Sequence, residues 1–588
     1  MTRMKIAFAA LLLAAIVNVV PQVTAQTPTI KVILAGSSAQ WQTLALGAYN
    51  DGKCVSGGTA PCFHYTASTF NLTDTRPTLK SGGVAAVDTG NLWIVWDSAA
   101  NPNVWAFIKV DSGVGDRCYY AQPRCTVSDS TFPAAANIIS SSLWGDGSSD
   151  TTPPTNIQAV FISGTTQISA AASDIRPEDA LFATCRANSK LGGGADGLAG
   201  LGYNTTNASG TCVTYSSKNT LAQLEGADVQ SGYPGSTSTA HVLAFALSGK
   251  DPFSGTAIPA GISTVSVGAT PVIPVVSVTS ALAGATNATD AQLQTLFSGA
   301  DCEGAVLGAA GGPVSVFLRE PLSGTMNTIE YNVFRYWDYS GASQETGVNA
   351  TNPLVQQPCV AGGGTRSRAI GTGEEVKSVL NSVTNTGNDG IGYTFFSYGN
   401  VSSIANNPSY AYLTLDGVDG IFHKYGTTID PGQPATAGEL PAAANLPATC
   451  AGGAGAFPCA EGKIWSGNLS FPNLRNGSYK AWSNLRAISN STALTALETL
   501  VAGSNTFVTT TVPDYVPAAK VGSTDPGLPL LRSHYLQEGV SPVNVSTTGD
   551  KGGDVGGCIL TSTGTAITSD TTTGLVTQSP GAGCIVKP

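Results

Sequence analysis

The fold is most clearly indicated by the stretch Val314-Ser315-Val316-Phe317-Leu318-Arg319-Glu320-Pro321-Leu322-Ser323-Gly324-Thr325. It opens with an apolar run of the kind that forms a buried strand. After it, Met326, Ile329, Val333 and Trp337 recur at helical spacing, and Ser323 is a good N-cap for that helix. A strand that passes through a short polar turn into a helix is the basic unit of an α/β protein.

The same unit recurs along the chain. Residues 30–35 form an apolar run that leads through Gly36-Ser37-Ser38 into a helical pattern at 41–49. Thr289 and Gln292 have the spacing of a capping box. Further strands are expected at 92–96, 104–110, 272–278, 314–318, 392–396 and 412–415, and further helices at 290–297 and 374–383. This alternation predicts an α/β fold with a mainly parallel sheet.

The turn between strand and helix has the composition of an anion site. The first amides of a helix have no partner within the helix and carry partial positive charge, so they attract anions. Gly324 leaves the backbone open to a ligand, Thr325 adds a hydroxyl, and Arg319 offers a planar fork that matches oxyanions. The alternative interpretation is an ordinary capped helix beside a surface arginine.

At this point the sequence resembles the phosphate-binding components of bacterial phosphate ABC transporters, which have the type II periplasmic-binding-protein fold. The run Arg319 to Thr325 is similar to that family's loop, in which an arginine precedes Ser-Gly-Thr. Supporting segments are Ala35-Gly36-Ser37-Ser38-Ala39, Ser173-Asp174-Ile175-Arg176-Pro177, Gly390-Ile391-Gly392-Tyr393 and Tyr412-Leu413-Thr414-Leu415-Asp416-Gly417. The resemblance implies a two-lobed α/β fold.

The domain layout follows from that resemblance. Residues 26–265 form lobe one with insertions, 266–415 form lobe two, and 416–588 return to lobe one and end in an extension. Because the chain is longer than a bare two-lobed protein, the resemblance also implies large insertions, mainly across 50–160 and 185–260.

The resemblance also assigns roles to single residues. Asp174 matches the family's carboxylate, which accepts a hydrogen bond from protonated phosphate and repels sulfate, an anion without a proton to donate. Its alternative role is an N-cap before Pro177. The family's Ser-Gly turn is not found cleanly, and Asp111-Ser112-Gly113 is the best candidate. The implied ligand-binding residues are Ser38, Ala39, Ser112, Asp174, Arg319, Ser323, Gly324 and Thr325.

The N-terminus and the cysteines indicate export. Arg3 and Lys5 precede an apolar run, and Val23-Thr24-Ala25 supplies a small-residue cleavage site, so residues 1–25 read as a signal peptide cleaved near Ala25. The chain has 12 cysteines and no CxxC motif, which favours disulfides over a zinc site. We expect a periplasmic or secreted protein with sequential pairs, Cys54/Cys62, Cys118/Cys125, Cys185/Cys212, Cys302/Cys359, Cys450/Cys459 and Cys558/Cys584.

Charge and motifs exclude other classes of function. A formal net charge of −10 argues against nucleic acid as a partner. The glycines 192, 194 and 197 match GxGxxG, but no strong strand precedes them, so a surface loop is the better interpretation. The sequence has no GxSxG, HExxH or P-loop motif, and His534 is better explained by a structural role. We therefore expect neither an enzyme nor a cofactor or metal.

These observations predict an exported solute-binding protein that captures a small oxyanion, inorganic phosphate, for uptake, and whose partner is a membrane ABC permease. The alternative is an extracellular structural or adhesive protein that reuses the phosphate-binding fold without transport. A third interpretation keeps the fold and replaces phosphate with another anion, such as a small carboxylate.

Overall fold

The computed structural model describes residues 27–50, 61–74, 86–175 and 262–334 with short gaps, 357–395 without 370, 409–420, 479, and 481–506. It also describes three short strands, β7 (His241–Val242), β17 (Thr565–Ser569) and β18 (Leu575–Pro580), which form a small sheet of their own. The expected signal peptide, the glycines 192 to 197, His534 and the disulfides Cys185/Cys212, Cys450/Cys459 and Cys558/Cys584 lie outside the described residues.

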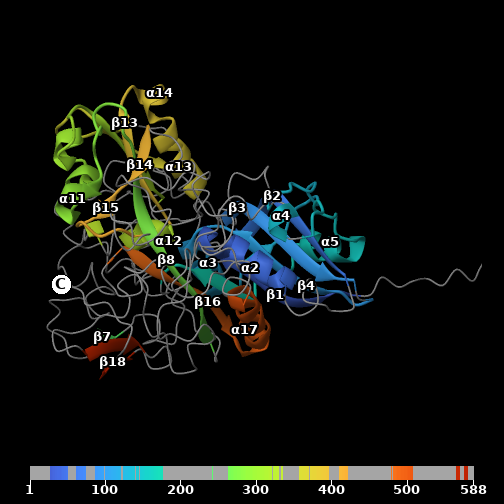
Figure 1. Ribbon diagram of the computed structural model, residues 1–588. Coiled ribbons are helices and arrows are strands. Elements are labelled where there is room, and N and C mark those ends of the chain that lie inside the picture. Colours follow the sequence, from blue (N-terminus) through green and yellow to red (C-terminus); the bar gives the residue numbers. More distant parts are fainter. Residues whose placement is uncertain are drawn as a thin grey trace, which may run out of the picture.

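A 13-stranded curled sheet organises the described part, in the order β11-β12-β10-β13-β8-β16-β6-β1-β4-β3-β2-β5 with β14 beside β8 (Figure 1). The α/β class expected from the sequence is confirmed. The sheet is mixed, however: only β1 with β4 and β6, and β10 with β12 and β13, pair in parallel. The expectation of a mainly parallel sheet was therefore too simple, because hairpins and the strand β16 add antiparallel pairs.

The first half of the sheet has helices on both faces. Its strands are β1 (Thr29–Gly36), β2 (Cys62–Asp74), β3 (Ala86–Asp97), β4 (Asn103–Lys109), β5 (Thr126–Val127), β6 (Ala170–Ser173) and β16 (Trp482–Asn490). Its helices are α2 (Ser38–Asn50), α3 (Ser112–Tyr120), α4 (Ser141–Trp144), α5 (Thr155–Ile162) and α17 (Ser491–Thr506). Along β1, Val32 and Leu34 pack into the core under α2 and α17, whereas Ile33 and Ala35 pack into the core under α3 and α5. This alternation follows from the two-residue period of a strand.

The second half has its own hydrophobic core. Its strands are β8 (Ile262–Ser277), β9 (Asn287–Ala288), β10 (Val314–Arg319), β11 (Gln357–Pro358), β12 (Thr365–Ala369), β13 (Asp389–Phe395), β14 (Tyr410–Tyr412) and β15 (Thr414–Leu415). Its helices are α11 (Asp290–Ser298), the 3₁₀ helix η5 (Gly304–Leu307), α12 (Gly324–Ile329), α13 (Thr372–Leu380) and α14 (Ser382–Thr386). The expected capping box opens α11: the Gln292 N–H donates to the Thr289 hydroxyl, and the Gln292 side chain accepts from the Thr289 N–H.

The long strand β8 joins the two halves and turns their strand ends toward each other. Residues 262–271 of β8 pair with β16 in the first half, and residues 272–277 pair with β13 and β14 in the second. Since β8, β16 and β6 alternate in direction and β13 runs against β8, the carboxyl ends of β6 and β13 face one another along β8. Figure 1 shows β8 and β16 between the blue and the green-to-yellow halves.

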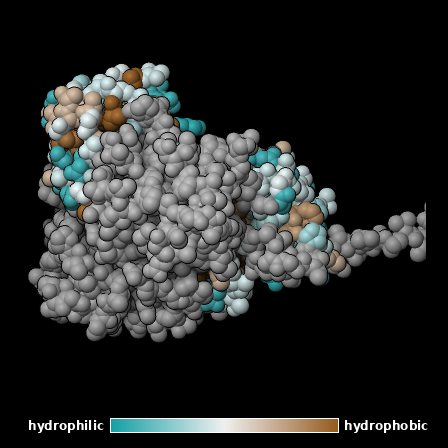
Figure 2. All heavy atoms as spheres, viewed as in Figure 1, coloured by the Kyte–Doolittle hydropathy of each residue, from teal (hydrophilic) through white to brown (hydrophobic). Residues whose placement is uncertain are grey.

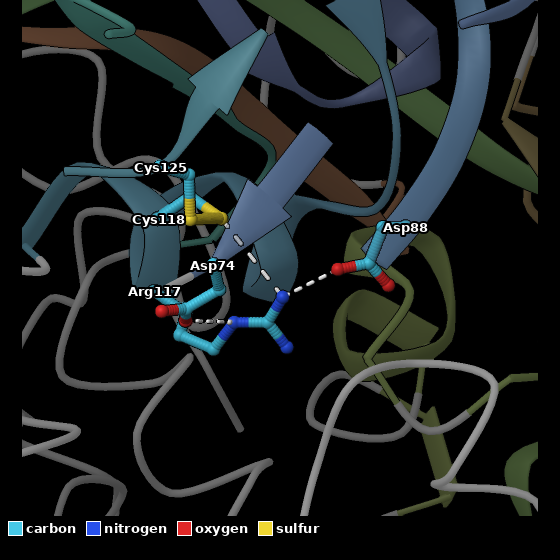
Figure 3. The surroundings of a disulfide bond; sticks show 5 residues. All are labelled: Asp74, Asp88, Arg117, Cys118 and Cys125. Atoms are coloured by element: carbon cyan, nitrogen blue, oxygen red, sulfur yellow. Dashed lines mark hydrogen bonds and ion pairs between the residues drawn. A yellow bond between two sulfur atoms is a disulfide. The ribbon is translucent and has the colours of Figure 1, made fainter. Parts of the chain in front are cut away.

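Two of the expected disulfides are present. Cys118–Cys125 closes the loop after α3, and Figure 3 shows it beside Arg117. Cys302–Cys359 ties the loop after α11 to β11. Cys62 is also disulfide-bonded, but its expected partner Cys54 lies outside the described residues.

The surface of the described residues is mixed in polarity, with brown apolar spheres scattered among teal and white ones (Figure 2). The large exposed apolar side chains there, Val87, Ile138, Ile162, Val360 and Val383, come from separate elements. Among the described helices, none has the length and apolar character that crossing a membrane requires.

Candidate functional site

Three predicted residues, Ser112, Asp174 and Arg319, lie at or shortly after the carboxyl ends of parallel strands, together with Ser37 and Thr372, which were not predicted. Ser37 follows β1, Ser112 follows β4 and Asp174 follows β6; in the second half Arg319 ends β10 and Thr372 follows β12. Ligands of open α/β sheets bind at the carboxyl ends of strands, where loops and helix N-termini converge. The two halves therefore present these strand ends to each other.

Asp174 joins the first-half residues into one buried cluster. Its Oδ1 accepts a hydrogen bond from the Ser37 hydroxyl, and its N–H donates to Ser112 Oγ at 3.1 Å. Ser37, Ser112 and Asp174 are all at least 97 % buried. Ser112 is the first residue of α3, so the Ser-Gly turn that was hard to find in the sequence lies beside the predicted carboxylate.

The first turn of α2 is arranged differently from the expectation. Ser37, not Ser38, bonds to Asp174 and also accepts the Ala39 N–H at 3.1 Å. Ser38 is the first residue of α2 and is partly exposed. The sequence could not distinguish the two serines, because both lie in the same strand-to-helix turn.

Second-half residues reach across to this cluster. A Cβ added to Gly324 would collide with Ser112 Oγ and would lie 2.6 Å from Asp174 Oδ2, so only glycine fits against the first half. The Gly113 N–H donates to the Leu322 carbonyl at 3.1 Å. The Leu322 side chain is fully buried in the first-half core, which contributes about 1.5–3 kcal/mol for a leucine. The two halves thus meet directly at the predicted loop.

Ser323 and Thr325 complete the turn into α12. The Ser323 hydroxyl accepts the Met326 N–H at 3.3 Å, as expected of an N-cap. Thr325 is buried in the first turn of the helix. The structure therefore brings Ser112, Asp174, Gly324 and the loop around Ser323 together, with Arg319 at the base of that loop.

Arg319 is buried and holds a carboxylate of its own chain. Its Nε and Nη2 donate to the two carboxylate oxygens of Glu320 at 2.7 and 2.6 Å, and Nη1 donates to Thr372 Oγ1 at 2.7 Å. A guanidinium has five N–H donors, so these three bonds leave two for other partners. The Arg319 fork was predicted to face a ligand, whereas here its Nε side faces Glu320, which sequence reasoning missed.

Glu320 also receives the Gly371 N–H at the start of α13, at 3.1 and 3.2 Å. Burial acts to raise the pKa of Glu320, but the Arg319 guanidinium outweighs burial and lowers this pKa to about 2. Glu320 therefore stays ionised beside Arg319. In the sequence, the adjacent opposite charges of Arg319 and Glu320 could have indicated this pairing.

Asp174 and two basic residues beside it, Arg486 and Lys109, add further charge at the site. Burial raises the pKa of Asp174 to about 6, although the Ser37 hydrogen bond and the charges of Arg319 and Arg486 oppose it. Arg486 is fully buried on β16 opposite Ser173, next to Asp174. Burial, with the Arg319 charge, lowers the pKa of Lys109 at the end of β4 to about 8. Arg486 lies more than 300 residues away from Asp174 in sequence, and no local pattern pointed to it.

Comparisons with known proteins give the following picture. The sequence matches no family model and no curated protein. Its structure is similar to the ancestral soluble variant of the human phosphate binding protein (14 % identity, 83 % of this chain and 91 % of that one, TM-score 0.30). It is also similar to the phosphate binding protein of Stenotrophomonas maltophilia (12 % identity, 68 % of this chain and 76 % of that one, TM-score 0.27). A third similar structure is an ABC-type phosphate transport receptor of Vibrio cholerae (12 % identity, 42 % of this chain and 67 % of that one, TM-score 0.22). With TM-scores this low, these similarities carry no further argument.

Proposed function

We propose that the chain is an exported binding protein that captures inorganic phosphate between its two halves. The observation that supports this most is the convergence of Ser37, Ser112, Asp174 and Gly324 at the facing strand ends. The Arg319 guanidinium and the first turns of α2 and α3 border the same place and favour an anion. Delivery to a membrane permease is part of the proposal.

The carboxylate of Asp174 gives the proposed site its selectivity. An ionised Asp174 accepts a hydrogen bond from a protonated oxyanion, whereas sulfate offers no proton and meets repulsion. Since burial raises the pKa of Asp174 to about 6, the acceptor form prevails above that pH. Phosphate affinity should therefore fall as the pH drops below about 6.

A second candidate function follows from Glu320. Its carboxylate sits on Arg319 and on the N–H at the start of α13, as a small anion would. In this alternative the internal carboxylate fills the site and the chain is an extracellular structural protein without a ligand. Binding experiments separate the two functions.

Calorimetry of the mature protein with phosphate and with sulfate, at matched ionic strength, tests the proposal. The wild-type chain should bind phosphate far more tightly than sulfate. Asp174→Asn should reduce this preference by about tenfold or more, because the amide can donate to sulfate. Asp129→Asn, a change of the same charge at the half-exposed loop after β5, is the matched control and should leave both affinities unchanged.

Absence of binding by the wild-type protein would exclude the phosphate proposal and favour the structural alternative. An unchanged preference in Asp174→Asn, with phosphate still bound, would show that another group selects the anion.

A further inference from the structure

Asp111 and Glu320 bring two carboxyl groups together across the boundary between the halves. Asp111 follows β4 in the first half and Glu320 follows β10 in the second. Their side chains share a hydrogen bond, and Arg319 Nη2 lies 3.6 Å from Asp111 Oδ1. Two carboxyl groups can share a hydrogen bond only if one of them carries a proton.

The proton belongs on Asp111. Glu320 receives two N–H groups of Arg319 and the Gly371 N–H, all of which stabilise its charged form. Asp111 has only the more distant Arg319 Nη2 at 3.6 Å as an ion-pair partner among the described residues. Its O–H can then donate to the Glu320 carboxylate.

The charged groups that face Asp111 from the neighbouring elements reinforce this assignment. From the second half these groups are Glu320 and Arg319, and from β3 the group is Asp88. Asp88 forms an ion pair with Arg117, whose Nη2 lies 2.5 Å from it and whose Nε lies 3.4 Å from Asp74 (Figure 3). Two negative neighbours and one positive neighbour thus surround Asp111. Burial, followed by the charge of Glu320, raises the pKa of Asp111 well above its ordinary value.

When an anion binds, the proton on Asp111 also prevents repulsion between the Asp111 carboxylate and the anion. The site contains the carboxyl groups of Asp111, Asp174 and Glu320, against the cations Arg319, Lys109 and Arg486 at its border. Adding phosphate brings one or two further negative charges into a buried place. An ionised Asp111 beside Arg319 would repel that anion, and burying uncompensated charge is costly.

We infer that the site captures its anion together with a proton held on Asp111, so that Asp111 determines which charge state of the protein binds. This inference rests on the proposed function. In the step itself, a proton from the buffer adds to a carboxylate oxygen of Asp111, and the O–H donates to Glu320. No covalent bond to the anion forms or breaks.

The sign of the pH dependence follows directly. Below the raised pKa of Asp111 the group is already neutral, and binding requires no added proton. As the pH rises through that pKa, each bound anion must bring one proton, so the affinity falls by up to about tenfold per pH unit. This fall accompanies a rise in pH, whereas the fall due to Asp174 accompanies a drop in pH below about 6.

Phosphate calorimetry from about pH 6 to about pH 9, in pairs of buffers with different ionisation enthalpies, measures both the affinity and the protons taken up. The wild-type chain should take up more protons at the alkaline end than Asp111→Asn, and its affinity should fall more steeply there. Phosphate's own titration contributes equally to both proteins. The Asp129→Asn control should match the wild type.

Parallel pH profiles with equal proton counts in the wild type and Asp111→Asn would overturn the inference while leaving phosphate binding intact. Failure of the wild type to bind phosphate would instead overturn the proposed function and the inference with it. If Asp111→Asn does not fold, the wild-type proton count decides alone. Uptake that does not exceed the contribution of phosphate itself would then overturn the inference.

Discussion

Asp389 and Asp111 are both acidic side chains at sheet ends, and their surroundings differ in one respect. Asp389, at the start of β13, accepts the N–H groups of Thr279, Ser280 and Leu282 at 3.1, 2.8 and 2.9 Å, with the Thr279 hydroxyl at 2.5 Å. Burial acts to raise its pKa, but these hydrogen bonds, the Thr279 hydroxyl first, lower it. Asp111 faces Glu320 instead, and burial, followed by the charge of Glu320, raises its pKa.

In this chain, hydrogen-bond donors distinguish a structural carboxylate from the carboxyl group that we propose to be functional. Hydrogen-bond donors surround Asp389, so its ionised form is stabilised as soon as the chain folds. Asp111 instead lies beside Glu320 and has only Arg319 Nη2, at 3.6 Å, as an ion-pair partner among the described residues, so its charge state can respond to a ligand. Shifted pKa values of this kind are common at functional sites, although structural ion pairs also produce them.

The largest effect should come from removing Arg319. Arg319→Ala leaves the buried Glu320 carboxylate without its guanidinium, which should lower the free energy of unfolding by roughly 3–5 kcal/mol. The double variant Arg319→Met/Glu320→Gln removes both charges and should recover most of that loss. Urea unfolding measures the stability, and calorimetry should find no phosphate binding in either variant.

The two variants separate the effect of Arg319 on stability from its effect on phosphate binding. Equal stability of the single and double variants would show that Glu320 does not depend on Arg319. Phosphate binding by the double variant would show that Arg319 does not serve the ligand.

A smaller loss is expected at the structural carboxylate. Asp389→Ala leaves the N–H groups of Thr279, Ser280 and Leu282 without their acceptor and should lower the free energy of unfolding by roughly 2–3 kcal/mol. Phosphate affinity should remain that of the wild type. Because the folded-state pKa of Asp389 is lowered, its contribution is present above its ordinary pKa and is lost as the pH falls through the folded value.

Urea unfolding of Asp389→Ala and of the wild type at several acidic pH values tests this direction. The difference between their free energies of unfolding should shrink as the pH falls. If Asp389→Ala instead lost phosphate affinity and kept wild-type stability, Asp389 would serve binding and not the stability of the fold.

Local features of the fold were predictable from the sequence, and distant pairings were not. The capping box at Thr289, the strand before Arg319 and the disulfide Cys118–Cys125 depend on neighbours in sequence, and all three are confirmed. The disulfide Cys302–Cys359 spans 57 residues, and it was predicted because the two cysteines are consecutive in the chain. The strand β16 pairs with β6 and β8, from which it is separated by more than 200 residues, and no periodicity announces such a partner.

The site shows the same division. Its residue types could be identified because Arg319, Ser323 and Gly324 follow a strand in one short run. Their partners could not: the sequence does not state that Ser37 bonds to Asp174, or that Glu320 occupies the Arg319 fork. The Ser37–Asp174 contact depends on the pairing of β1 with β6, which no local pattern in the sequence specifies. The predicted boundaries at 265/266 and 415/416 and the ligand roles stay predictions.

The smallest change, one methyl group at Gly324, tests that contact between the halves. The added Cβ would lie 2.6 Å from Asp174 Oδ2 and 2.7 Å from Asp174 Cβ, too close for either half to keep its place. Overpacking of this kind costs about 1–3 kcal/mol, so Gly324→Ala should weaken phosphate binding by roughly tenfold or more. Calorimetry measures the affinity, and urea unfolding shows how much of the cost is present without ligand.

Gly373→Ala is the matched control, because Gly373 also lies in the first turn of a helix, α13, and nothing occupies the space its Cβ would take. Alanine there should leave the affinity unchanged and stabilise the helix by up to about 1 kcal/mol. If Gly324→Ala behaves like this control, the halves do not need to meet at Asp174 for the anion to bind. If it instead loses affinity while its unliganded stability stays at the wild-type value, the contact forms mainly with the ligand, and closure is driven by the anion.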